Sequence, residues 1–203
     1  MPSLGARQRL STDGAGTEQE APRLFAFFKP RGMETTCSAG SDLRKFLKRG
    51  QLHPVGRLDR DTTGLLLLSG DGDCTNRMLH AGIPKTYAAL VRGVLGDNLI
   101  QKVLSEGVEL ADGHVDVARL EVIDGDDVPF GIVAYPLSSI PTNGCSMIRI
   151  TTTCGRNRVV RRTLAATGHP VLLLHREGIG SITLPPGARP GDPPVSISVE
   201  CIP

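Results

Sequence analysis

The segment HPVGRLDRDTTGLLLL at residues 53–68 decides how the rest of the chain is interpreted. Its last four residues, Leu65–Leu68, form an uninterrupted apolar run that predicts a buried strand. Upstream, the apolar run Leu24–Phe28 predicts another short strand, which ends at the turn signature KPRG at residues 29–32. Downstream, the turn GDG at residues 70–72 leads into a helix that we expect over roughly residues 74–80.

Two aspartates stand just before the predicted strand and could carry chemistry. Asp59 and Asp61 alternate with Arg57 and Arg60. An opposite charge within about 4–6 Å lowers the pKa of a carboxyl group, so these arginines are expected to keep Asp59 ionised. An ionised carboxylate fixed at a strand edge can act as a nucleophile. The alternative is that Asp59 or Asp61 is only a turn or capping residue.

Short strands outnumber helices along the whole chain. Further strands are expected at residues 87–91, in several pieces between 108 and 134, and at 147–151, 171–174, 181–184 and 195–199. Further helices are expected after Ser41-Asp42, from a cap at Asp97 to about residue 104, and from Arg156 to Thr167. Short turns favour antiparallel pairing over repeated βαβ units. We therefore expect an α+β fold, with a mixed, mainly antiparallel central sheet and flanking helices.

Size and composition set the outer limits. The chain has 203 residues and a mass of 21.6 kDa, which is typical of one compact domain. Residues 1–22 are polar and have no hydrophobic period, so we expect a disordered tail followed by one domain over residues 23–203. No apolar run approaches the ~20 residues of a membrane-spanning helix, so no membrane partner is expected. The five cysteines are scattered without a C-x-x-C pair, which favours free thiols over a zinc site.

The formal net charge of +2 conceals a strong segregation of charge. Acids dominate residues 97–127, whereas residues 148–176 hold six arginines and no acid. Without acids beside them, the arginines of residues 156–162 suit contacts to phosphate groups, and the acidic stretch is expected to be a solvated outer face turned away from a nucleic acid. Aromatic residues make up only 3% of the chain, which argues against RNA binding by rows of stacked aromatic side chains.

The segment at residues 53–68 resembles the catalytic motif of the RsuA/RluE-type pseudouridine synthases, whose G-R-L-D core matches residues 56–59. Three further motifs occur in the family's order: FKPRG at residues 28–32, KTY at 85–87 and GRNRVVRR at 155–162. The segment HREGIG at residues 175–180 fits the family's last segment. The resemblance covers residues 24–203 and implies the pseudouridine synthase catalytic fold. We expect a catalytic domain without the small N-terminal RNA-binding domain of many members, as in the short RluE type, which modifies large-subunit ribosomal RNA.

The resemblance also implies a set of site residues. Asp59 would be the nucleophile, Tyr87 would stack on the flipped base, and Arg161, or else Arg158, would pair with Asp59. The residues implied to contact RNA are Arg57, Lys85, Arg156, Asn157, Arg158, Arg162 and Arg176. The reaction breaks the N-glycosidic bond of uridine and rejoins the ring through carbon, so neither a redox step nor a group donor is needed. The resemblance therefore implies no cofactor and no metal, and its implied partner is RNA.

Two alternatives stay open. Val159 stands where the family usually has Gln, and Thr163 where it has Met, which leaves room for a non-catalytic RNA-binding or ribosome-assembly factor with the same fold. The residues DRDTT at 59–63 also fit the D-x-D-x-T signature of magnesium-dependent phosphatases, but in those enzymes the hydrophobic strand precedes the motif. The chain is expected to be monomeric and cytoplasmic, with import into an organelle or the nucleus left open.

Overall fold

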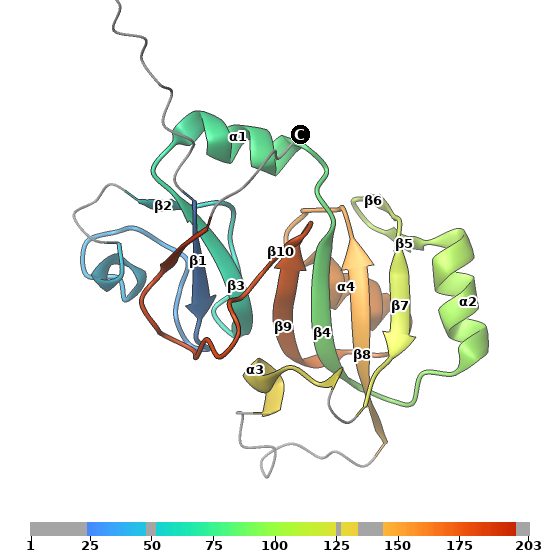
Figure 1. The fold of residues 1–203 in the computed structure, drawn as a ribbon. Coiled ribbons are helices and arrows are strands. Elements are labelled where there is room, and N and C mark those ends of the chain that lie inside the picture. Colours follow the sequence, from blue (N-terminus) through green and yellow to red (C-terminus); the bar gives the residue numbers. More distant parts are fainter. Residues whose placement is uncertain (1–23, 48–51, 125–126, 134–143, 198–203) are drawn as a thin grey trace, which may run out of the picture.

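The computed structural model describes residues 24–47, 52–124, 127–133 and 144–197 (Figure 1). Nine strands of these residues form one sheet, and two more form a separate hairpin. The sheet contains β1 (Leu24–Lys29), β2 (His53–Pro54), β3 (Thr62–Ser69), β4 (Lys85–Arg92), β7 (Arg119–Val122), β8 (Cys145–Thr152), β9 (Val171–Ile179), β10 (Ile182–Thr183) and β11 (Val195–Ile197), and the hairpin consists of β5 (Val108–Leu110) and β6 (Gly113–Val115). The tail expected at residues 1–22 lies outside the described residues.

The sheet is mixed and mainly antiparallel, which confirms the fold class expected from the sequence. Its strands follow the order β11-β1-β3-β9-β4-β8-β7, with β2 added to β3 and β10 added to β9. Among the described pairs only β3 and β9 run parallel. Their pairing joins the two halves of the sheet, because β1 lies on one side of it and β4 on the other.

The described helices are short and cover both faces of the sheet. They are the 3-10 helix η1 (Leu43–Lys45), α1 (Gly72–His80), α2 (Asp97–Glu106), α3 (Phe130–Val133) and α4 (Val159–Ala166). Figure 1 shows α4 behind β4 and β8, where Ala89 of β4 packs with Leu164. The next residue along β4, Leu90, packs on the other face with Ile132 of α3. No helix in the described ranges has the length and apolarity needed to cross a membrane.

The apolar run of β3 is buried completely because it lies between two layers. Leu66 and Leu68 pack on one side together with Phe27 of β1. Leu65 and Leu67 pack on the other side, where α1 supplies Cys74 and Met78. Side chains that alternate between two covered faces give the continuous hydrophobic run seen in the sequence.

Gly64 allows β3 to approach β9 closely. It pairs with Arg176 and has a φ of +106°, a value that side chains rarely adopt. A Cβ atom at this position would overlap the backbone of Arg176. The glycine that follows the two threonines of the motif is thus required by the junction between the two halves of the sheet.

Several element boundaries differ from those expected. The helix expected from Arg156 begins at Val159, because Arg158 adopts a left-handed conformation with a φ of 50°. Asp97 is the first residue of α2 rather than its cap, and the extended Gly96 takes the cap position. Residues 108–134 were expected to form only short strands, but they also contain the helix α3. The loop expected at residues 136–144 and the end of the strand expected at 195–199 fall largely outside the described residues.

Candidate active site

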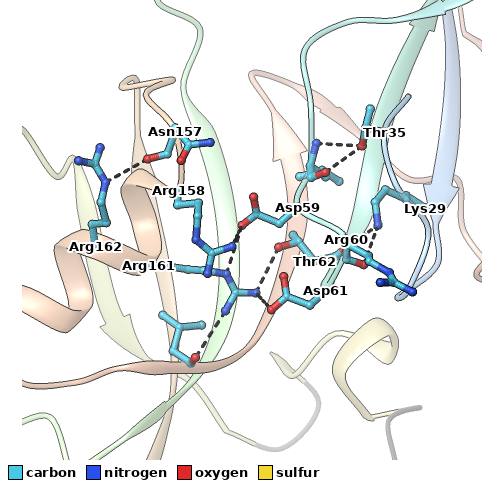
Figure 2. A network of polar contacts seen from close by, with 12 residues as sticks. Lys29, Thr35, Asp59, Arg60, Asp61, Thr62, Asn157, Arg158, Arg161 and Arg162 are labelled. Atoms are coloured by element: carbon cyan, nitrogen blue, oxygen red, sulfur yellow. Dashed lines mark hydrogen bonds and ion pairs between the residues drawn. The ribbon is translucent and has the colours of Figure 1, made fainter. Parts of the chain in front are cut away.

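Asp59 lies in the loop between β2 and β3, and hydrogen bonds on both sides fix this loop (Figure 2). The carbonyl oxygen of Asp59 accepts a hydrogen bond from the backbone N–H of Thr62 at 3.1 Å. At the preceding residue, the Thr35 hydroxyl donates to the Leu58 carbonyl at 2.9 Å and lies 3.2 Å from the Leu58 N–H. The loop is therefore anchored independently of its charged side chains.

Lys29 adds a buried support under the same loop. Its side chain is inaccessible to solvent, and Nζ donates to the carbonyl oxygens of Thr62 at 2.8 Å and Pro30 at 2.9 Å. Burial lowers the pKa of Lys29 to about 8, although Asp61 and Asp59 act in the opposite direction. The lysine of the KPRG turn thus holds the start of β3 through backbone carbonyls.

The Asp59 carboxylate pairs with two arginines from the other half of the sheet. Its Oδ2 lies 2.8 Å from Nη1 of Arg158 and 3.4 Å from Nε of Arg161. Figure 2 shows both guanidinium groups converging on this oxygen. The sequence-based expectation named Arg161 first and Arg158 as its alternate, whereas the structure brings both to Asp59 and gives Arg158 the shorter contact.

Among the described residues, the ion pairs of Asp59 are with Arg158 and Arg161, and neither Arg57 nor Arg60 forms one with it. Nε of Arg60 donates to the Gly32 carbonyl at 3.0 Å and so ties the loop to the KPRG turn. Arg57 is exposed and lines the cavities around Asp59. The partners come instead from a segment about 100 residues away, which spacing within one motif could not indicate.

Arg161 is held inside the site by several partners. Nη2 lies 2.9 Å from Oδ2 of Asp61 and 3.3 Å from Oγ1 of Thr62. Burial lowers the pKa of Arg161, opposed mainly by the charge of Asp61. Even so, an arginine stays protonated in proteins. Asp61, which the sequence left as a turn residue or a nucleophile, therefore acts here as a second counter-ion.

The arginines at the start of α4 are not all free, contrary to the expectation from the sequence. Asp112, in the turn between β5 and β6, lies 3.1 Å from Nη1 of Arg156 and 2.8 Å from Nη1 of Arg162. Arg156 also donates to the carbonyl oxygens of Gly113 and His114 at 3.0 and 2.6 Å. One residue of the acidic stretch thus faces the arginines rather than away from them, because the hairpin returns to α4.

A cavity of about 180 Å³ lies beside Asp59, and eight of its lining residues were expected at the site: Arg57, Asp59, Lys85, Tyr87, Arg156, Arg158, Arg161 and Arg176. Tyr87 and Lys85 come from β4, and Arg176 comes from β9 directly opposite Tyr87. Apolar side chains from the β2–β3 loop, α1, α4 and β9 line the cavity as well: Val55, Leu58, Met78, Leu79, Val159, Val160, Leu174 and Ile179. The cavity therefore combines apolar walls with six cationic side chains, and Asp59 is the one acid in its lining.

Arg176, one of the residues expected to contact RNA, is buried. Its side chain is only 3% exposed, and Nε donates to the Leu65 carbonyl at 2.7 Å. It belongs to the interior of the cavity rather than to the outer surface of the protein.

A second, open cleft of about 950 Å³ adjoins Asp59 on the side of the KPRG turn. Its lining includes five arginines as well as Asn157 and Glu34. The arginines are Arg31, Arg57, Arg60, Arg156 and Arg158. Asp59 lines both the cleft and the smaller cavity, so a ligand in the cleft can present one group to Asp59. In the described part of the chain, no three His, Cys, Asp or Glu side chains are placed to hold a metal ion.

The residues that sequence reasoning missed are Lys29 and Thr35, which support the Asp59 loop, and Asp112, which holds two arginines. Lys29 belongs to the FKPRG motif at residues 28–32, so the sequence marked its position, but nothing in the motif indicated that its side chain is buried. No sequence pattern distinguished Asp112 from the other acidic residues of the same stretch.

The family model described as RNA pseudouridylate synthase matches residues 23–166. An uncharacterised RNA pseudouridine synthase of Mycobacterium tuberculosis is 40% identical over 186 residues, which cover 86% of this chain and 66% of the relative. The chain thus spans just under two thirds of the length of that relative. The ribosomal large subunit pseudouridine synthase B of Bacillus subtilis is 34% identical, with 91% of this chain and 72% of the relative covered.

Two solved structures extend this similarity. A crystal structure of a pseudouridylate synthase superposes with a TM-score of 0.71 at 27% identity, covering 88% of this chain and 71% of that one. An archaeal box H/ACA Nop10–Cbf5 complex shares the fold, with a TM-score of 0.53 at 17% identity and coverage of 79% of this chain and 48% of that one.

Proposed function

The chain belongs to the RNA pseudouridylate synthase family, and on this premise we propose that it converts a specific uridine of an RNA into pseudouridine. The observation that carries this proposal is the position of Asp59. Its carboxylate is fixed between Arg158 and Arg161 at the boundary of an arginine-lined cleft and a small cavity. The cleft has the charge to hold an RNA backbone, and the cavity has apolar walls suited to one base.

The chemistry of an isomerisation fits this arrangement. The bond between N1 of uracil and C1′ of ribose breaks, the ring rotates, and C5 bonds to C1′ in its place. N1 gains a proton and C5 loses one, so the substrate and product have the same composition and no external donor is consumed. Asp59 acts at the ribose or the ring as the nucleophilic group, while Arg158 and Arg161 hold its side chain in place.

Tyr87 and the cleft have supporting roles in this proposal. Tyr87 lines the cavity from β4 and is placed to stack on a base that has left its helix. Arg57, Asn157 and Arg158 line the cleft and would contact the phosphates on either side of that base. Extruding a base costs a few kcal/mol, so loops and weakly paired uridines are the preferred targets.

The RNA is proposed to be large-subunit ribosomal RNA. Relatives from Bacillus subtilis and Vibrio parahaemolyticus that are 34% and 37% identical are named for the large ribosomal subunit. We propose further that the protein acts as a monomer in the cytoplasm, without a cofactor.

Chemical mapping of pseudouridines in ribosomal RNA tests the function. Maps are compared for the wild-type strain, a deletion strain and the deletion strain complemented with Asp59→Asn. One position is expected to be modified only in the wild type. Asp59→Asn keeps the shape of the side chain, so its protein should retain the wild-type melting temperature. Identical maps in all three strains would count against the enzyme and favour a non-catalytic assembly factor.

The phosphatase alternative has little support from the geometry. Strand β3 follows the two aspartates instead of preceding them, and each carboxylate already pairs with an arginine. Pseudouridine formation by the purified protein in the presence of EDTA would separate the two reactions.

A further inference from the structure

Arg176 places a positive charge in the cavity wall, and no carboxylate of the described residues pairs with it. Its side chain is 3% exposed, and Nη2 has no hydrogen-bond partner in the described part of the chain. A buried charged group without a counter-ion is costly, so the unpartnered Nη2 of such a group in a cavity wall points to a ligand that binds there.

The strand geometry places this side chain in the cavity. Along β9, Leu174 and Arg176 share one face of the sheet and line the cavity, whereas His175 between them points to the other face and packs against Phe28. Across the sheet, Arg176 pairs with Tyr87 of β4. The guanidinium group therefore lies beside the tyrosine that is proposed to stack on the base.

Lys85 adds a second cation to the same wall. It lies two residues before Tyr87 on β4, lines the cavity and is half-buried. Its Nζ donates to one backbone oxygen, that of Ile83, at 3.0 Å, and none of the described carboxylates pairs with it. Burial and the nearby Arg176 both lower the pKa of Lys85. Two cations without a paired carboxylate, in a small cavity whose lining holds six cations and Asp59 as its one acid, favour a ligand that is negatively charged or becomes so.

The proposed reaction supplies such a ligand. When the N1–C1′ bond breaks, its electron pair remains on the uracil ring, and the resulting negative charge is shared by N1, O2 and O4. The positive charge left at C1′ is met by the Asp59 carboxylate on the other side of the broken bond. Donors that are fixed before the reaction stabilise such developing charge far better than water does.

We propose that Arg176, assisted by Lys85, binds a carbonyl oxygen of the uracil ring and stabilises the negative charge that the ring acquires when its glycosidic bond breaks. This inference rests on the proposed function, because the ring becomes anionic only in that reaction. It makes Arg176 a catalytic residue of the base pocket and separates it from the arginines that hold phosphates in the cleft.

The test measures single-turnover pseudouridine formation and RNA affinity for Arg176→Gln, Arg176→Lys and Lys85→Gln. Arg176→Gln should slow the reaction by roughly 10²–10³-fold, the loss typical of removing one such donor, and change the dissociation constant of RNA by less than about threefold. Arg176→Lys restores the charge and should recover at least about tenfold of the rate. The control is Arg92→Gln, which removes one charge at the exposed opposite end of β4 and should leave both quantities unchanged.

Three outcomes would overturn the inference. The first is a rate for Arg176→Gln close to that of the wild type, under conditions in which Asp59→Asn is inactive. The second is equal losses for Arg176→Gln and Arg176→Lys with a lower melting temperature in both, since that pattern belongs to the structural bond from Nε to Leu65. The third is a wild-type rate for Lys85→Gln, which leaves that bond intact and tests the cationic wall by itself. If the wild-type protein itself forms no pseudouridine, that result contradicts the proposed function, and the inference on Arg176 falls with it.

Discussion

His175 precedes Arg176 on β9, and its side chain packs on the opposite face of the sheet, away from the cavity. Its ring is 4% exposed, lies 2.9 Å from the Thr63 hydroxyl through Nδ1 and packs edge-on against Phe28. Burial lowers the pKa of His175 from 6.5 to about 4. The folded protein therefore contains the neutral ring over the range in which an unfolded chain would already be protonated.

Stability is predicted to fall as the pH is lowered from about 6.5 to about 4. In that window the unfolded chain binds more protons than the folded one, so the free energy of unfolding decreases by up to about 3 kcal/mol. Above pH 6.5 the contribution is fully present. Chemical denaturation at pH 7.5 and 4.5 measures the change. His175→Asn keeps a polar atom for Thr63 but does not titrate, so its loss between the two pH values should be smaller.

His80→Asn is the matched control, because this histidine is exposed at the end of α1 and is solvated in both states. It should retain the wild-type loss of stability between pH 7.5 and 4.5. An unchanged pH dependence in His175→Asn would show that other groups cause the loss.

At the scale of elements, the hairpin β5–β6 controls how much positive charge α4 presents. Asp112 pairs with both Arg156 and Arg162, and Arg162 still exposes about a third of its side chain. A phosphate group that approaches these arginines competes with one carboxylate already in place.

Asp112→Asn is predicted to tighten RNA binding at low salt. Removing the carboxylate frees positive charge for phosphates, so the plot of log affinity against log salt concentration should become steeper by about one. Asp97→Asn removes an equal charge at the exposed start of α2 and serves as the control. An unchanged affinity and slope for Asp112→Asn would mean that phosphates do not reach these arginines.

Arg158→Ala and Arg162→Ala are predicted to weaken RNA binding and to flatten its salt dependence, each by about one phosphate contact. Arg158→Ala should also slow the reaction, because it removes the shorter contact to Asp59. Binding measured at low and high salt separates the two effects. Wild-type affinity of both variants at both salt concentrations would refute phosphate contacts by these residues.

The junction between β3 and β9 is predicted to tolerate no side chain at residue 64. Gly64→Ala combines a left-handed conformation with overlap on the Arg176 backbone, so a loss of at least about 3 kcal/mol is expected. This corresponds to a fall of roughly 10 °C in melting temperature. Gly72→Ala places a methyl group in open space at the start of α1 and should leave the melting temperature nearly unchanged. Similar melting temperatures for the two variants would contradict the close approach.

The elements that the sequence predicted well are those with an uninterrupted apolar pattern. Leu24–Phe28 and Leu65–Leu68 both lie in strands as expected, because their side chains are buried on the covered faces of the sheet. The strand expected at 171–174 extends to Ile179, since buried polar side chains such as His175 and Arg176 interrupt the hydrophobic signal.

The candidate site was predictable only as far as local motifs reach. The spacing around Asp59 left it open as a nucleophile or a turn residue, and its partners Arg158 and Arg161 became clear only through the resemblance and the fold. The contact between Asp112 and α4 depends on how a hairpin returns in space, which neither periodicity nor charge counting can reveal.

At the scale of the whole molecule, one hydrophobic core spans both halves of the sheet. Phe27 and Leu66 on one side of the junction belong to the same buried cluster as Ile148 and Leu164 on the other. Neither half can lose its packing without exposing the other.

Thermal unfolding is therefore predicted to be a single cooperative transition. Calorimetry should give a van't Hoff enthalpy equal to the calorimetric enthalpy, and circular dichroism should report the same midpoint. Two resolved transitions would show that the halves of the sheet unfold independently.

The ion pair between Asp59 and Arg158 joins residues 99 positions apart in the chain. During synthesis the N-terminal half leaves the ribosome first, and β1 can pair with β3 before Arg158 and Arg161 have been made. Only after β9 has also been made can the sheet close and the carboxylate meet its partners. A nascent chain therefore passes through translation with this site unassembled, and the site proposed to modify RNA is completed as one of the last steps of folding.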